Sequence, residues 1–285
     1  METILSAEAE TTRLFELLGR ILSFSEAEIY VLVAVFTRVG AVAALLPGFG
    51  EQAVPVRIRL AGAIAFTALV WPMVTPSLVG PESAVGGLGP IQGAGAPPFA
   101  LGRLLMAEAA AGLALGLAVR ILVMALQFAG SIAAQATSVL QIFGAGVTPD
   151  PMPAIGNILL ISGIALALSM GLHVKAVIAM VDSYTILPFG VFPVAGDLAE
   201  WGVSRASAAF AFAFGLAAPF LAAGLIYNLA LGAINRAMPQ LMVALVGAPA
   251  ITGAAILILG LSATVILGHW AAMVDQTLAN PFGVR

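Results

Sequence analysis

Residues 127–157, QFAGSIAAQATSVLQIFGAGVTPDPMPAIGN, lie near the middle of the chain between two long apolar runs. They carry one charge, Asp150, and their glycines and alternating prolines prevent a helix from running through the whole stretch. Such backbone at membrane depth must be buried in protein or line a watery cavity, because lipid offers no partner for N–H and C=O groups. We therefore interpret about residues 130–153 as a re-entrant, plug-like loop that organises the flanking helices. An apolar surface loop is the alternative.

The composition places the rest of the chain in a membrane. Hydrophobic residues make up 61% of the 285 positions and charged residues only 9%, against about 45–50% and about 25% in soluble domains. We expect a polytopic membrane protein with a single embedded helical domain over residues 29–270. An amphipathic N-terminal segment at 1–28 and a C-terminal tail at 271–285 would flank it.

Apolar stretches long enough to cross a bilayer, which takes about 20 helical residues, predict an all-α fold of about six long helices. Basic residues in short connections stay on the cytoplasmic side, which places Arg57, Arg59 and Arg236 there. The expected spans lie near residues 29–46, 58–79, 100–126, 155–181, 205–231 and 240–268.

Three ionisable side chains, Arg38, Glu108 and Arg120, fall well inside the expected spans. Each is costly in lipid and marks a partner, a cavity or a functional path. Glu108 and Arg120 are twelve positions apart on one helix, about 18 Å along its axis, so they cannot pair with each other. We expect charge contacts elsewhere, made within the chain or between subunits.

Small residues in the third expected span predict close helix packing. Gly112 and Gly116 have the G-x-x-x-G spacing that lets two helix backbones approach each other. We favour contacts within a larger membrane assembly, and ordinary packing inside the chain is the alternative.

Several function classes lack support in the sequence. The chain has no cysteine, and His173 and His269 have no neighbouring ligand in a metal-binding or catalytic spacing. A net charge of −3 argues against a nucleic-acid surface. We therefore expect no enzymatic activity, no cofactor and no bound metal.

Four elements together resemble the FliR family, the flagellar biosynthetic proteins of the bacterial type III export gate, and its injectisome counterparts. The last element is the most specific because its polar residues recur in order: Asn228, Asn235, Arg236, Pro239 and Gln240. The four elements are Arg38 followed by Leu46–Gly50, Val54-Pro55 with Arg57 and Arg59-Leu60, the segment 130–157, and Tyr227–Gln240 followed by Val246–Pro249.

This resemblance implies a non-enzymatic subunit of the flagellar protein-export gate, located in the bacterial inner membrane at the flagellar basal body. Its implied partners are P-like and Q-like membrane proteins in a helical assembly of tilted hairpins, the export switch protein, and the exported unfolded flagellar subunits. The family's plug loop corresponds to bulky Leu140, Ile142 and Phe143 here, followed by Gly144 and Gly146 where relatives are bulkier.

Two alternatives remain open at this point. A self-contained small-solute transporter would use Arg38, Glu108 and Arg120 as a coupling path, and a virulence injectisome would use a related gate subunit. Co-purification with P-like and Q-like proteins in mild detergent would distinguish a gate subunit from a transporter.

Overall fold

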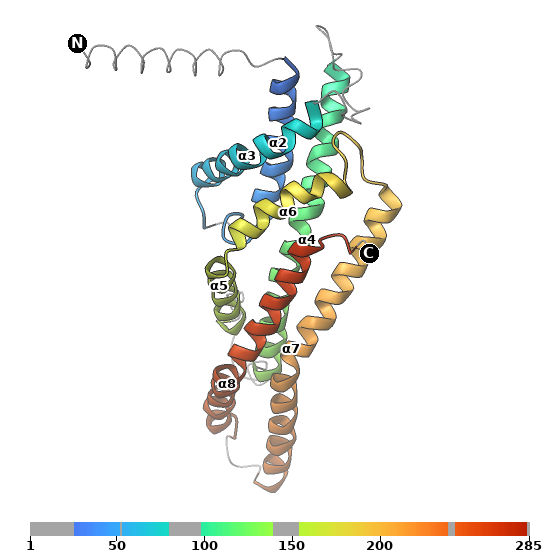
Figure 1. The fold of residues 1–285 in the computed structure, drawn as a ribbon. Helices are drawn as coiled ribbons and strands as arrows, with labels where there is room; N and C mark the ends of the chain where they lie inside the picture. The colour runs from blue at the N-terminus through green and yellow to red at the C-terminus, as the bar shows by residue number, and fades with distance from the viewer. Residues whose placement is uncertain (1–25, 52, 80–97, 139–153, 239–242, 284–285) are drawn as a thin grey trace, which may run out of the picture.

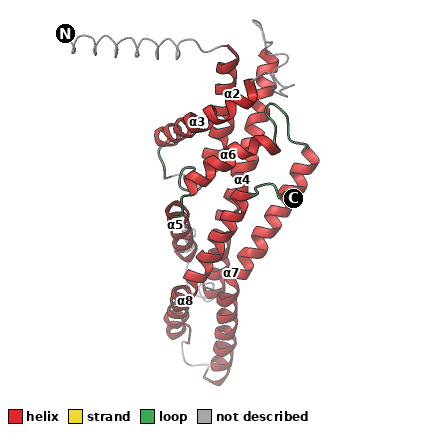
Figure 2. Ribbon diagram, viewed as in Figure 1, coloured by secondary structure: helices red, strands yellow, loops and turns green. Residues whose placement is uncertain are grey.

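A computed structural model describes residues 26–51, 53–79, 98–138, 154–238 and 243–283. Every regular element within these ranges is a helix, which confirms the predicted all-α class (Figure 2). The helices are α2 Glu26–Leu45, α3 Val56–Val79, α4 Pro98–Ser138, α5 Ala154–Ser169, α6 Leu172–Ile186, α7 Ala195–Ala237 and α8 Val243–Ala279.

Helix α4 is the centre of the molecule, since α2, α5, α7 and α8 all pack against it. In Figure 1, α2, α4, α7 and α8 run along the length of the molecule, whereas α3 and α6 cross it. Helix α3 packs mainly against α2 and, to a lesser extent, against α6. The helices are therefore not a simple bundle of parallel spans.

Five of these helices are long and apolar enough to cross a membrane, and α5 with α6 provides a sixth span if the pair is counted as one. The stretch expected as a span at 155–181 is not one continuous helix, because α5 and α6 meet at an angle of 73°. Gly171 at this break has a φ of 78°, a left-handed conformation that glycine adopts without a Cβ clash.

Several helix ends also differ from the expectation. Helix α4 continues through Gly130 to Ser138, so the first part of segment 127–157 is helical. Helix α7 begins at Ala195 instead of residue 205, and α8 continues to Ala279, past the expected end at residue 268. Burial of Ala129 and Ala133 explains the continuation of α4, because tertiary packing stabilises a helix beyond what its local propensity supports.

Two kinds of packing hold the bundle together. Alanines form the seam between α4 and α7, where Ala125 and Ala129 pack with Ala209 and Ala213. Larger side chains fill the main core, in which Trp270 of α8 is fully buried and donates its indole N–H to the carbonyl oxygen of Leu122 at 2.8 Å. This hydrogen bond satisfies the buried indole and ties α8 to α4.

Candidate functional site

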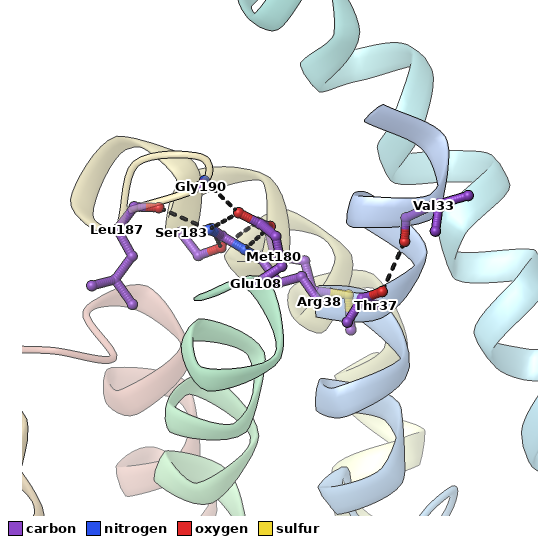
Figure 3. A network of polar contacts seen from close by, with 8 residues as sticks. All are labelled: Val33, Thr37, Arg38, Glu108, Met180, Ser183, Leu187 and Gly190. Carbon is purple, nitrogen blue, oxygen red and sulfur yellow. Dashed lines mark hydrogen bonds and ion pairs between the residues drawn. The ribbon is translucent and has the colours of Figure 1, made fainter. Parts of the chain in front are cut away.

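Arg38 of α2 and Glu108 of α4 form the centre of a buried polar cluster (Figure 3). The guanidinium Nε lies 2.8 Å from Oε2 of Glu108, and Nη2 lies 3.1 Å from Oε1. The two side chains are 1% and 0% exposed. This is the bidentate geometry in which a guanidinium binds a carboxylate most strongly.

The cluster also includes α6 and the turn at residues 187–190 that follows it. Arg38 donates from Nη1 to Oγ of Ser183 at 3.2 Å and from Nη2 to the carbonyl oxygen of Leu187 at 3.0 Å. The backbone N–H of Gly190 donates to Oε1 of Glu108 at 2.8 Å. The guanidinium lies 3.8 Å from the ring centroid of Tyr184, a cation–π contact. One ion pair thus connects α2, α4, α6 and the turn leading to α7.

Sequence reasoning found the two charges of this cluster but missed its other members. Leu187 and Gly190 contribute backbone groups, and the identity of a residue does not indicate whether its carbonyl or N–H binds a distant side chain. Ser183 contributes a hydroxyl that also donates to the carbonyl oxygen of Met180, as serines in many helices do. Neither these three residues nor Tyr184, the fourth member that was missed, carries a sequence signal that separates it from an ordinary helix or turn position.

Arg120, the third predicted intramembrane charge, lies on α4 and binds Glu51 at 2.5 Å. Glu51 belongs to the connection between α2 and α3, directly after the motif Leu46–Gly50. Gly48 in that motif has a φ of 82°, so a glycine fits there without strain. The ion pair therefore links the α2–α3 connection to the middle of α4. The side chains of Arg120 and Glu51 both remain partly exposed.

Gly112 and Gly116 mark the closest approach of α4 to α2. A Cβ atom at Gly112 would collide with the carbonyl oxygen of Arg38 and lie 2.9 Å from the Cβ of Ala41. A Cβ at Gly116 would lie 2.9 Å from the Cβ of Leu45. The two glycines thus serve packing inside the chain, which was the alternative to contacts with other subunits.

The residues of the last-hairpin motif are only partly described by the structure. Asn228, Asn235 and Arg236 lie on the exposed final turns of α7, which end at Ala237. Arg236 is in the last turn, where a cation interacts favourably with the negative end of the helix dipole. The other two members, Pro239 and Gln240, lie outside the described residues.

The predicted plug residues Leu140, Ile142, Phe143, Gly144 and Gly146 also lie outside the described residues, so their role stays a prediction. The helices on either side are described. A Cβ at Gly130 of α4 would collide with the Cα of Gly156 in α5 and lie 2.5 Å from its backbone nitrogen. The backbones of α4 and α5 therefore touch at Gly130 and Gly156, eight residues before the end of α4 and two residues after the start of α5.

Comparison with known proteins connects these features to one family. The chain is 34% identical over 241 residues to the flagellar biosynthetic protein FliR of Caulobacter vibrioides, covering 82% of this chain and 90% of that relative. It is 28% identical over 248 residues to the FliR protein of Aquifex aeolicus, covering 85% and 88%. The family model described as bacterial export proteins, family 1, matches residues 29–277, from the helix that carries Arg38 to the end of α8. The chain therefore belongs to family 1 of the bacterial export proteins.

Proposed function

We propose that this chain is a non-enzymatic subunit of the flagellar type III protein-export gate in the bacterial inner membrane. The observation that carries the proposal is the family match over residues 29–277, together with relatives named flagellar biosynthetic protein FliR. The similarity covers the helical body from α2 to α8 and is not confined to one motif. Because the matched relatives are named as flagellar proteins, we favour a flagellar role over an injectisome role.

The surface of the α7–α8 pair supports membership in a larger assembly. Large apolar side chains on both helices are more than half exposed, including Ile226 and Leu229 of α7 and Leu257 and Leu261 of α8. Exposed apolar surface of this extent needs lipid or protein neighbours. We infer that P-like and Q-like membrane proteins cover part of it, and that the assembled gate contacts the export switch protein and unfolded flagellar subunits.

A gate that passes an unfolded polypeptide must stop ions and small molecules when it is idle. Apolar constrictions can do this by excluding water. Leu140, Ile142 and Phe143 supply the bulk for such a constriction, and Gly144 and Gly146 would let the backbone swing aside for cargo. The contact between the backbones of α4 and α5 supports this assignment, because it holds the helix that follows the segment against the helix that precedes it.

The contacts of the intramembrane charges give no support to a solute transporter. Arg38 binds Glu108, and Arg120 binds Glu51. A coupling path needs charged groups that can exchange partners with a solute or ion, whereas these groups are engaged inside the chain.

The test is a deletion of residues 140–146 in cells that produce the complete export apparatus. The deletion should leave the complex intact while raising its single-channel conductance and making the cells sensitive to small solutes. Phe143→Ala should act in the same direction, and Phe99→Ala, at an exposed position at the start of α4, is the matched control. Wild-type conductance in a deletion variant whose complex still co-purifies would show that this segment does not close the channel.

A further inference from the structure

The turn at residues 187–190 is the first part of the connection from α6 to α7, and two of its backbone groups form hydrogen bonds with distant side chains. The carbonyl oxygen of Leu187 accepts from Arg38, 149 positions away, and the N–H of Gly190 donates to Glu108, 82 positions away. A backbone group buried without a partner costs free energy comparable to a lost hydrogen bond. The placement of this turn therefore depends on two charged residues of other helices.

The atoms that bind the turn are also atoms of the ion pair. Nη2 of Arg38 donates both to Oε1 of Glu108 and to the carbonyl oxygen of Leu187. Oε1 of Glu108 accepts both from this Nη2 and from the N–H of Gly190. The ion pair and the turn share Nη2 and Oε1, so neither group can move without disturbing the other.

The turn is in addition one wall of an apolar pocket of about 330 Å³. Leu187 and Pro188 of the turn line this pocket together with Val191, Trp201 of α7 and Phe282. Trp201 is held in place by a 3.1 Å hydrogen bond from its indole N–H to the carbonyl oxygen of Pro281. A displaced turn would thus change both the start of α7 and the shape of this pocket.

We propose that Arg38 and Glu108 are positioning residues that set the place of the 187–190 turn and, with it, the start of α7. Both side chains are buried, and together they supply the donor and the acceptor that the turn's backbone uses. The simpler alternative is that the pair only holds α2 against α4. Positioning of the turn and attachment of α2 to α4 predict different results when the two charges are replaced by apolar side chains.

A double variant, Arg38→Met with Glu108→Leu, separates the two roles. Apolar residues of similar volume often replace a buried ion pair without loss of stability, because the desolvation cost of the charges disappears. The contact between α2 and α4 should therefore persist in this variant. The donor for Leu187 and the acceptor for Gly190 are lost, so the turn should no longer be held in one place.

Distances between pairs of spin labels measure both contacts in the whole 285-residue chain. The chain has no cysteine, so each introduced cysteine is a unique labelling position. Labels at the exposed positions Val33 of α2 and Met106 of α4 report on the α2–α4 contact. Labels at Met106 and at the exposed Val191 report on the turn.

In the apolar double variant, we expect the Val33–Met106 distance distribution to stay at its wild-type width and the Met106–Val191 distribution to broaden at least about twofold.

Exchange of the charges, Arg38→Glu with Glu108→Arg, should restore an ion pair. It should not restore the narrow Met106–Val191 distribution of the wild-type turn. It would place a carboxylate against the Leu187 carbonyl and a guanidinium against the Gly190 N–H, two pairs that cannot form hydrogen bonds.

The matched control is Arg120→Met with Glu51→Leu, which removes an ion pair elsewhere on α4 and should leave the turn distribution unchanged. A wild-type turn distribution in the apolar double variant would overturn the proposal, as would equal broadening of both distributions. If the double variant does not fold, Arg38→Lys tests the Leu187 contact alone, because Glu108 and its bond to Gly190 remain. Lysine keeps the charge but has a single nitrogen in place of the guanidinium fork, so the Met106–Val191 distribution should broaden, by less than in the double variant, while α2 stays on α4. An unchanged distribution in Arg38→Lys would count against the proposal.

Discussion

Replacing Gly112 by alanine should separate α2 from α4, because a Cβ atom has no room at this position. It would collide with the carbonyl oxygen of Arg38 and lie 2.9 Å from the Cβ of Ala41. Carbon atoms pack at about 3.5–4.0 Å, so the helices must move apart by at least about 0.6 Å. Neither obstacle is the flexible end of a side chain, which means that the backbone of α2 itself has to shift.

Gly102 on the same helix provides the control for this substitution. A Cβ there would meet no atom within 4 Å, and both alanine variants gain up to about 1 kcal/mol of helix propensity. The difference between the two variants therefore isolates the steric cost. Overpacking of this kind costs about 1–3 kcal/mol, so we expect the free energy of unfolding of Gly112→Ala to be lower than that of Gly102→Ala by this amount.

Thermal denaturation of the purified chain in mild detergent measures this difference. In proteins of about 150–250 residues, 1 kcal/mol corresponds to roughly 2–4 °C in the midpoint. The Val33–Met106 label distance should also lengthen in Gly112→Ala and not in Gly102→Ala. Equal midpoints and equal label distances in the two variants would refute the close approach of α2 and α4 at Gly112.

Two further substitutions test other contacts. Trp270→Phe should lower the free energy of unfolding by about 1–3 kcal/mol, since it removes a buried hydrogen bond to Leu122 and leaves a cavity. The same change at the partly exposed Trp201 should cost less in the same denaturation assay. Arg236→Glu should reduce swimming motility and recovery of the export complex much more than Arg236→Lys, because only lysine keeps a positive charge at the end of α7. Equal motility of the two Arg236 variants would exclude a role for this charge.

Local features of the sequence were sufficient to predict the class of fold and most of its helices. Hydropathy over about 20 residues identifies a membrane helix wherever that helix lies, and this is why the stretches at 29–46, 58–79 and 100–126 correspond to α2, α3 and α4. The amino-acid motif around Asn235 and Arg236 was sufficient to indicate the export family. The hydropathy of a span and the order of residues in a motif are both properties of positions that are close together in the chain.

Helix ends and bends depended on the tertiary structure. Gly130 is a poor helix former, yet α4 continues past it because its neighbours are buried and its backbone touches that of Gly156. Residues 155–181 are predominantly apolar, with exceptions such as His173 and Lys175, and their mean hydropathy does not give the 73° angle between α5 and α6. Propensity and hydropathy describe one segment at a time, whereas these features depend on which segments lie against it.

The sequence by itself determined that Arg38, Glu108 and Arg120 need partners, because a charge at membrane depth is costly without one. Only the tertiary structure decided which partners they have. Arg38 meets Glu108 across 70 positions of the chain, and the two then bind a carbonyl and an N–H of the turn at 187–190. Every residue has a backbone carbonyl and every residue except proline has an N–H, so the sequence does not show which of these groups are used. Their selection follows from the packing of α2, α4 and α6, which brings one turn within hydrogen-bonding distance of one ion pair.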